Sequence, residues 1–600
     1  MGSVLRKRPI GIQMTWSQLL ASDRWIFVLS VVFSLLLYGG TLNNGYSIDD
    51  YLVAENLEMV NQGVSGIPEI LTTYYGETDL GNPFEYRPIT RITFALERSL
   101  WGEILWVSHF INILMYALLV FVVFQFFLSL MGSQYKTLLL LTSFLFLFHP
   151  IHSEVVCSLK NRDEILSLLL AFCSGMLLIK FVKKKSALLM IGSSLLFILS
   201  LATKPGQLPL VGVIVLGLLL FQKRPLKDLI WAGLPFFILT ASYLATVIHF
   251  FPQWWRLDYA YEENSLDFLS GFSERLPTAF VALTHNIRML IWPHPLSFFY
   301  GHDHISVAQW SDGIVWIGVG ALVVLTLGFF GLIKKHPIVS FGIGIFIMSV
   351  SPFLNVIGAV AGIVAERWLL AASIGFCLIL AYLLLGLLQS SKLRLAGVSL
   401  ILLLLVLSSV RIISRIPDWK SSRTLVYKDV ETVPRSFVPN FLAARFYLED
   451  SELADDPDEK ERLLRLSFRS NEMLVDICIK KARFLRRCTE QSLQLGENGK
   501  AVGYAMRLFE EGGNKLDHSV AAMQTLLTLS EAQNGLNVSK QASYIHPGRF
   551  QPLVYQGNFY LMLGDTAKAI DVYQIAMNTQ DAQPRIQDYI DQLKKAYSVE

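Results

Sequence analysis

The chain has 600 residues, of which 53% are hydrophobic and 16% are charged, and its formal net charge at pH 7 is +3. This composition is too apolar for an ordinary soluble protein, and the near-neutral charge excludes a nucleic-acid-binding protein that relies on a basic surface. The five cysteines are scattered without the spacing of a zinc site, so they indicate neither a metal centre nor a redox compartment.

Apolar runs long enough to cross a bilayer recur through the first two thirds of the chain and predict a polytopic membrane protein. They include Trp25–Leu42, Trp106–Leu130, Ile165–Val182, Leu229–Phe250, Val315–Ile333 and Trp368–Leu388. With the shorter apolar segments, we expect about eleven transmembrane helices. We interpret the first run as a retained span, because no clear cleavage site follows it. Leu276–Trp292 carries His285, Asn286 and Arg288, so we expect it to be a re-entrant or interfacial helix.

Lysine and arginine in the short loops orient these spans. Arg6, Lys7 and Arg8 precede the first span, which predicts a cytoplasmic N-terminus. Further basic residues share that side when about eleven helices cross: Lys136, Lys180, Lys183, Lys184, Lys185, Lys223, Arg224, Lys227, Lys334, Lys335, Lys392 and Arg394. An odd number of spans then places residues 413–600 on the outer side. The long loop 43–105 is on that side too.

The composition changes sharply after Arg411, which predicts a membrane domain over 1–412 and a soluble helical domain over 413–600. Residues 455–495 read as amphipathic helix, and one continuous helix would hold Cys478 and Cys488 about 15 Å apart, too far for a disulfide. A tetratricopeptide (TPR) repeat is predicted at about 550–584, and "PNFLAARFYLED" (439–450) resembles a second, degraded one. Its signature is Gly557, Tyr560, Gly564, Ala569, Tyr573 and Ala576. A generic helical hairpin is the alternative.

Polar clusters interrupt the apolar chain on the expected outer side. A charge at the bilayer centre costs roughly 2.5–3.5 kcal/mol on insertion scales, so clusters in or beside the membrane are functional candidates. In chain order the candidates are Asp49, Asp50, Tyr86, Arg87, His149, His152, Glu154, Arg162, Asp163, Glu164, Lys204, Glu366 and Arg367.

Each cluster also has a structural interpretation. The acid pair is compatible with a solvated turn, and Arg87 or Lys204 with snorkelling to lipid headgroups. His149 and His152 suit helix caps beside Pro150 or, together with Glu154, a metal site. Glu366 and Arg367 suit an internal ion pair.

Taken together, the acids and cations suggest the transfer of a sugar from a polyprenyl-phosphate. The acceptor hydroxyl needs a carboxylate base, and the departing phosphate needs Arg or Lys as charged hydrogen-bond donors. The lipid tail needs a groove within the membrane, which the spans can supply.

At this point the sequence resembles a known family. In order, "DDYLVAEN", "YYG", "YRPITRITFALE", "HFIN", "HPIHSEVV", "NRDEIL", "PFLN" and "AERWLLAASIGFC" are similar to motifs of the transmembrane-and-TPR O-mannosyltransferases, and "DWKSSRTLVYKDVETVP" follows them. Each motif is short, but their order covers nearly the whole chain. The resemblance implies an all-α fold of the GT-C glycosyltransferase superfamily, in which an acid of the first outer loop works on a polyprenyl-phosphate sugar.

The resemblance also implies roles for individual residues. Asp49 and Asp50 match the first-loop acids; we favour Asp50 slightly as the general base, with the other acid as an orienting group or a metal neighbour. Arg87, Arg162 and Arg367 are expected to bind the donor phosphate, as is Lys204. The expected pocket residues are Tyr86, His149, His152, Glu154, Glu164 and Glu366.

Some positions depart from the family pattern. Asn56-Leu57 stands where an Asn-Pro pair is usual, and Lys204-Pro205 where Lys-Glu is usual, so an acidic partner of Lys204 is missing from the motif. The apparent shortness of the repeat array fits a bacterial relative, in the inner membrane with a periplasmic C-terminal domain. An endoplasmic reticulum membrane with a lumenal C-terminus is the eukaryotic alternative.

The expected function is therefore transfer of mannose or another hexose to a hydroxyl, of protein Ser or Thr in particular. The polyprenyl-phosphate sugar is a co-substrate, a divalent cation at Asp49 or Asp50 is an option, and the TPR-like helices offer protein contacts. A lipid or glycan acceptor, and a non-catalytic membrane scaffold that presents TPR helices, are the alternatives. We see no internal symmetry of the kind that transporters show.

Overall fold

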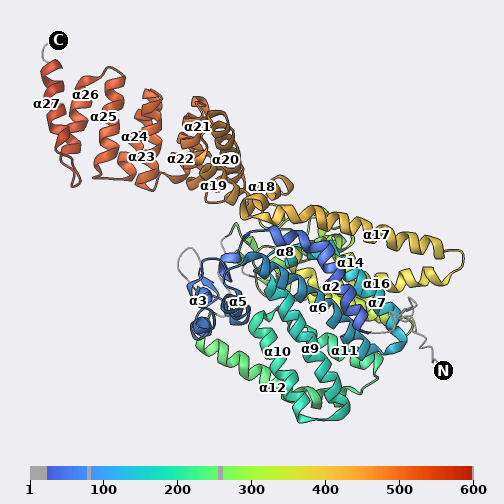
Figure 1. Cartoon of the computed structure of the whole chain (residues 1–600). Helices are drawn as coiled ribbons and strands as arrows, with labels where there is room; N and C mark the ends of the chain where they lie inside the picture. Colours follow the sequence, from blue (N-terminus) through green and yellow to red (C-terminus); the bar gives the residue numbers. More distant parts are fainter. Residues whose placement is uncertain (1–22, 78–82, 254–260, 270, 598–600) are drawn as a thin grey trace, which may run out of the picture. The chain divides into compact units, whose positions relative to one another are not determined.

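The computed structural model describes residues 23–77, 83–253, 261–269 and 271–597. Most of this part is helical, and the chain divides into two compact units, Met1–Thr432 and Val433–Glu600, here called the membrane unit and the helical unit (Figure 1). The cytoplasmic N-terminus is predicted from three basic residues that lie outside the described residues: Arg6, Lys7 and Arg8.

The membrane unit confirms an all-α polytopic membrane protein. Six helices of the described part are long and apolar enough to span, and seven if a pair bent by 52° counts as one span. The six are Asp23–Asn43, Leu105–Met131, Arg162–Lys184, Gly313–Leu332, Glu366–Gln389 and Arg394–Lys420, and the bent pair is Ser133–Leu147 with Pro150–Cys157. Shorter apolar helices lie between them, so the number eleven stays a prediction.

The helices of the membrane unit follow the apolar runs closely. Their bounds are α2 Asp23–Tyr38, α3 Glu58–Asn61, α4 Ile67–Ile70, α5 Pro88–Trp101, α6 Leu105–Met131, α7 Lys136–Leu147, α8 Ser153–Cys157, α9 Arg162–Lys184, α10 Ala187–Thr203, α11 Leu210–Phe221, α12 Leu226–Phe250, α13 Phe272–Ile291, α14 Gly313–Leu332, α15 Pro337–Val350, α16 Leu369–Gln389, α17 Arg394–Arg415 and α18 Ser422–Thr432. The expected interfacial segment is α13, which is not among the six long apolar helices of the described part.

Short 3₁₀ turns and one small sheet connect these helices and carry most of the polar clusters. The turns used below are η2 Asp50–Leu52, η5 Pro150–His152, η6 Pro205–Gln207, η9 Glu366–Trp368 and η10 Ile416–Lys420. Strands β1 Gly76–Glu77 and β2 Pro83–Phe84 pair antiparallel, with Gly76 opposite Phe84. Pro150 and Pro205 open two of the turns, since proline lacks the N–H that a helix interior requires.

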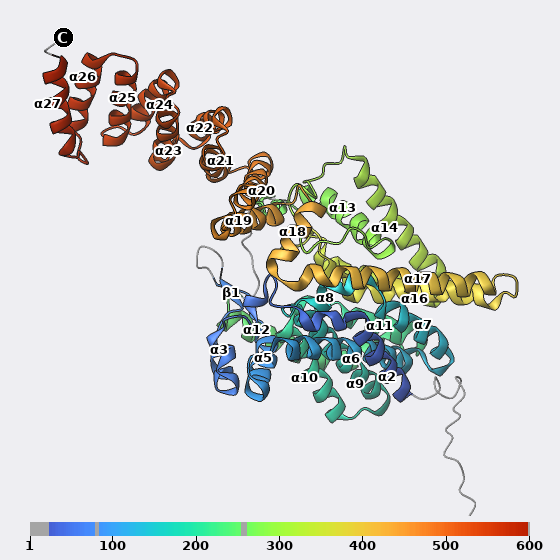
Figure 2. The ribbon, with the colours of Figure 1, turned by 45° about the horizontal axis from the view of Figure 1, so that its top comes forward.

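Helix α17 lies against α16 at the edge of the membrane unit, as two views show (Figures 1 and 2). Of its side chains only Gly397, Ile412 and Arg415 are buried. Its remaining apolar surface is exposed, as expected for a helix whose solvent is lipid. Beyond α17, α18 still belongs to the membrane unit, so the unit boundary follows Thr432 instead of the expected residue 412.

The helical unit consists of successive antiparallel helices (Figure 2). Their bounds are α19 Phe437–Leu453, α20 Pro457–Ile477, α21 Ala482–Gln494, α22 Asn498–Gly512, α23 Leu516–Thr528, α24 Ala532–Ile545, α25 Phe550–Met562, α26 Thr566–Met577 and α27 Arg585–Tyr597. The expectation of a short array underestimated the described part, because the earlier helix pairs lack the Gly and Tyr pattern of the last pair.

The hairpin predicted at 550–584 is present as α25 and α26. Gly557 faces the ring of Tyr573, and a Cβ at residue 557 would lie 2.3 Å from that ring. The small residue thus permits the close approach of the two helices. Its assignment to the TPR class stays a prediction.

The amphipathic stretch 455–495 is helical, but it forms two helices and not one continuous helix. Cys478 ends α20, and Ala482 begins α21. Both cysteines lie in one buried cluster with Phe468 and Leu485. The break lets both cysteine-bearing segments contribute to the same core.

Candidate functional site

Asp50 is completely buried where the first outer loop meets the segment before α9. Its Oδ2 accepts the Ser47 N–H at 2.8 Å and the Ser47 hydroxyl at 3.1 Å. Its Oδ1 accepts the Lys160 N–H at 2.7 Å and the Ser158 hydroxyl at 3.3 Å. Burial raises the pKa of Asp50 to about 7, while the Ser47 and Lys160 N–H groups oppose that rise. This carboxylate links the first outer loop to the segment before α9, and both of its oxygens are already engaged, so neither is available to a substrate.

Asp49 has the opposite environment. Its backbone is left-handed, with φ of 69°, a region in which Asp is enriched among non-glycine residues. The carboxylate is half-buried, and within the described residues it makes no hydrogen bond or ion pair. Arg367 is an electrostatic neighbour of this carboxylate. The geometry therefore distinguishes the two acids: both oxygens of Asp50 are engaged, whereas the half-buried carboxylate of Asp49 has no hydrogen-bond partner among the described residues.

Two acids at the start of α9 gather cations from three other segments. Asp163 pairs with Arg87 at 3.0 Å and with Lys204 at 3.3 Å, and Lys160 lies 3.9 Å away. Glu164 pairs with Lys204 at 2.7 Å. Asp163 and Glu164 therefore supply the acidic partners that the Lys204-Pro205 motif lacks, because η6 brings Lys204 back over the start of α9.

The charges of this cluster shift the pKa values of its members outside the spans. Burial lowers the pKa of Lys160 to about 8, and the positive charges of Lys204, Arg367 and Arg87 contribute to that shift. Burial also opposes the charge on Arg87, but Glu85 and Asp163 overcome it and keep the Arg87 pKa above its usual range. Sequence reasoning missed Lys160, since a lysine in a loop carries no signal of its burial.

Arg367 is the partner of Glu154. Its Nη1 donates to Glu154 Oε1 at 2.7 Å, and its backbone N–H donates to Glu154 Oε2 at 3.0 Å. Arg367 and Glu164 both line a cavity of about 10 Å³, room for about one water molecule. Arg367 thus lies between Glu154 and Glu164, and the cavity beside it is too small for a sugar; the assignment of these residues to a pocket stays a prediction.

Arg162 does not belong to the cluster of cations around Asp163 and Glu164, so the structure separates it from Arg87 and Lys204. It is fully buried, and its nitrogens donate to Asn112 Oδ1 at 2.6 Å, to Thr93 and Ser108, and to Glu97. Its guanidinium also stacks on Phe94 at 3.7 Å. Every nitrogen is occupied by α5 and α6, so Arg162 joins these helices to α9. Successive residues of an α-helix point about 100° apart around its axis, so Arg162 and Asp163 face different neighbours although they are adjacent in sequence.

The histidines and Tyr86 are held by structural contacts. His152 bridges the Tyr116 hydroxyl at 2.7 Å and the Ser373 hydroxyl at 2.9 Å. His149 lies 3.0 Å from the Leu290 carbonyl and accepts the Ile151 N–H, so it is a cap, as the structural interpretation proposed. Tyr86 donates to the Leu71 carbonyl at 2.9 Å and stacks on Phe251. Within the described residues no group of three or more metal-ligand side chains is found.

Glu366 and Arg367 are neighbours but not partners, so the expected internal ion pair between them is wrong. Glu366 accepts the Ser297 N–H at 2.6 Å and the Tyr300 hydroxyl at 2.8 Å. The loop 295–300 is thereby fixed beside η9, and the Phe298 carbonyl lies 3.5 Å from Arg367 Nη1.

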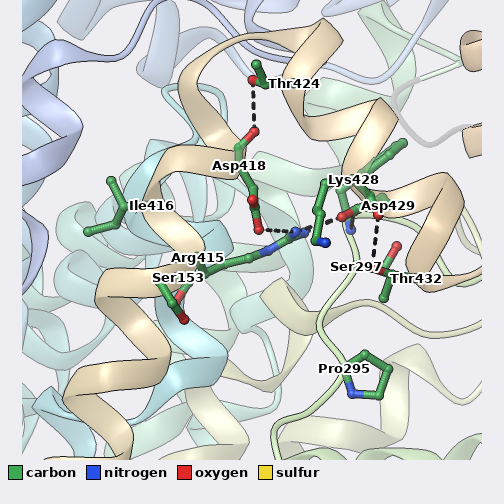
Figure 3. Close-up of polar contacts among 12 residues, drawn as sticks. Ser153, Pro295, Ser297, Arg415, Ile416, Asp418, Thr424, Lys428, Asp429 and Thr432 are labelled. Atoms are coloured by element: carbon green, nitrogen blue, oxygen red, sulfur yellow. Dashed lines mark hydrogen bonds and ion pairs between the residues drawn. The ribbon is translucent and has the colours of Figure 1, made fainter.

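The same loop is held from its other side by a buried pair that sequence reasoning missed. Asp429 of α18 accepts two hydrogen bonds from Arg415 of α17, at 2.7 and 3.0 Å, and the Phe298 N–H at 2.7 Å (Figure 3). Asp418 adds a contact to Arg415 at 3.0 Å. Asp429 lies in a stretch that reads as ordinary charged helix, so only the fold reveals its partner.

Comparisons with known proteins give one similarity. No family model and no solved structure matches the chain. Two curated proteins, the "Protein O-mannosyl-transferase TMTC2" of Mus musculus and of Homo sapiens, are each 27% identical over 146 residues. That segment is 23% of this chain and 16% of each relative. The chain is thus similar to a protein O-mannosyl-transferase over about one sixth of that protein's length.

Proposed function

We propose that this protein is a membrane glycosyltransferase that moves mannose or another hexose from a polyprenyl-phosphate to an acceptor hydroxyl, in particular that of protein Ser or Thr. One observation carries the proposal: a half-buried, unpaired carboxylate, Asp49, lies in the electrostatic range of Arg367 at the edge of a buried cation cluster. The partial similarity to an O-mannosyl-transferase supports the same class of reaction.

The residues divide the reaction between them. Asp49 takes the proton of the acceptor hydroxyl as its oxygen bonds to the anomeric carbon of the sugar. The bond from that carbon to the phosphate oxygen breaks, and the phosphate leaves with the electron pair. Arg367 stabilises its negative charge through hydrogen bonds, with Lys160 and Lys204 behind it.

The neighbouring acids have supporting roles in this scheme. Asp50 holds the loop that carries Asp49, while Glu154 orients Arg367. Asp50 is unsuited to a metal ion, because both of its oxygens accept protein N–H donors. A divalent cation at Asp49 is a separate proposal, which addition of a chelator to the active protein tests.

The test measures sugar transfer from labelled polyprenyl-phosphate mannose to a Ser/Thr peptide by the full-length protein in vesicles. Asp49→Asn keeps the shape of the side chain and removes the base, so we expect a loss of about 10²–10⁴-fold. Glu58→Gln is the matched control, since Glu58 is an exposed acid of the same loop. Wild-type transfer by Asp49→Asn would contradict the assignment of the base.

The helix array favours a second candidate function, a scaffold that presents the helical unit without catalysis. A scaffold requires neither Asp49 nor a donor. Absence of transfer by the wild-type protein to peptide, lipid and glycan acceptors, with intact partner binding, would support it. Transfer to a lipid or glycan but not to a peptide would instead change only the acceptor class.

A further inference from the structure

A second feature of the membrane unit is an apolar groove of about 270 Å³ between η5, the end of α13, α16 and α17. Its walls include Leu145, Phe148, Leu290, Phe376, Leu380 and Leu404. The buried histidine at the groove, His149, has both ring nitrogens engaged by the backbone, so the floor offers no free polar group from this residue. The groove therefore suits a hydrocarbon chain.

One end of the groove is positively charged. Arg411 of α17 lies there with Ser408 and His294. Its Nε donates to the Pro293 carbonyl at 3.4 Å, and no carboxylate within the described residues pairs with it. The cation at the end of an apolar wall thus has no salt-bridge partner among the described residues, and an anionic headgroup would supply one.

The surroundings of the groove are those of a bilayer edge. Leu407 of α17 is 55% exposed, and Trp292, which lines the groove, is 64% exposed. Exposed tryptophan at the end of apolar helices is typical of the membrane–water interface. Along α17, Leu404 lies about two turns from Arg411, so the apolar wall extends about 10 Å from the charge.

The groove is distinct from the candidate sugar-transfer site. The cavity beside Arg367 is lined by Leu370 and Ala371 of α16, whereas the groove is lined by Phe376 and Leu380 of that helix. No residue lines both. A polyprenyl-phosphate sugar held at Arg411 would not have the proposed phosphate residues around it, so an ordinary membrane lipid is the better occupant.

We infer that this groove binds an anionic bilayer phospholipid, with the phosphate on Arg411 and an acyl chain between α16 and α17. The single negative charge of a phosphodiester matches the single guanidinium at the groove, that of Arg411. The bound lipid fills the side of α17 that protein leaves open. This inference does not depend on the proposed sugar transfer.

The experiment uses the full-length protein in nanodiscs of phosphatidylglycerol and phosphatidylcholine, and measures retained lipid by native mass spectrometry after detergent exchange. We expect wild type to retain phosphatidylglycerol selectively. Arg411→Gln removes the charge, and Ser408→Phe fills the polar end of the groove without altering the buried core. Each should lower retention about five- to tenfold. Arg394→Gln, an exposed arginine at the other end of α17, is the matched control and should retain lipid normally.

Three outcomes would overturn the inference. Equal retention of the two phospholipids would exclude recognition of the headgroup. Normal retention by both Arg411→Gln and Ser408→Phe would place the lipid elsewhere. Displacement of phosphatidylglycerol by a stoichiometric amount of polyprenyl-phosphate would assign the groove to that lipid.

Discussion

Asp50→Asn should lower the stability of the membrane unit more than it lowers the transfer rate, because the fully buried carboxylate of Asp50 links two loops by hydrogen bonds. The carboxylate accepts four hydrogen bonds, two of them from the backbone N–H groups of Ser47 and Lys160. An amide has one acceptor oxygen, so one of these N–H groups would face another donor. The serine hydroxyls can rotate to accept from the amide, but a backbone N–H cannot.

The cost follows from that count. One buried donor without an acceptor costs about 1–3 kcal/mol. In a unit as large as Met1–Thr432, such a loss lowers the thermal midpoint by about 1 °C per kcal/mol. A thiol-reactive dye reports the transition, because Cys157 and Cys377 are buried in the membrane unit. Replacing Cys478 and Cys488 by alanine in all variants restricts the signal to that unit.

Asp49→Asn is the matched comparison, since Asp49 makes no contact that the amide would break. It should melt like the wild type and lose transfer, whereas Asp50→Asn should melt earlier and keep a measurable rate once folded. The opposite result, with a wild-type melting point and no transfer for Asp50→Asn, would refute this reasoning and restore Asp50 as the base.

Three further predictions concern the cations and the helical unit. Arg162→Ala should destabilise the membrane unit by about 3–5 kcal/mol, because it leaves the buried carboxylate of Glu97 without its charged partner. Arg367→Lys keeps the charge but loses the planar guanidinium, so it should raise the donor KM with little change in the melting curve. The donor KM of the wild type should rise roughly tenfold as pH increases through about 8, the pKa of Lys160, because the lysine then loses its charge. Lys160→Arg should move that rise to higher pH. An unchanged pH profile would exclude Lys160 from phosphate binding. Gly557→Val should cost about 1–3 kcal/mol and speed hydrogen exchange in α25 and α26, while Gly499→Val, with nothing within 4 Å, should exchange normally in those helices.

The sequence predicted the helical elements well because their signal is local. A run such as Trp106–Leu130 is apolar throughout, and α6 follows it as Leu105–Met131. The hairpin at 550–584 was found for the same reason, since Gly557 and Tyr573 are a fixed distance apart in sequence. The break at Cys478 was missed because no proline or glycine marks it.

The site was predicted in composition but not in the roles of its members. Arg162 and Asp163 are adjacent in sequence, yet one is enclosed by α5 and α6 and the other collects Arg87 and Lys204. Likewise, Asp50 is enclosed by Ser47 and Lys160 whereas Asp49 is half-buried, and no sequence pattern distinguished the two acids. Such differences depend on which loop covers a side chain, which is a property of distant segments.

The long reach of the buried ion pairs has a consequence for biosynthesis. At about 5–20 residues per second, a ribosome makes Lys204 seconds after Asp163, 41 positions earlier. Arg367 follows Glu154 by 213 positions, so this carboxylate waits on the order of ten seconds or more for its partner. During that interval the acid stays in water, in the headgroup layer or with an insertion factor. The membrane unit therefore closes late, and a nascent chain interrupted before Arg367 would leave Glu154 uncompensated.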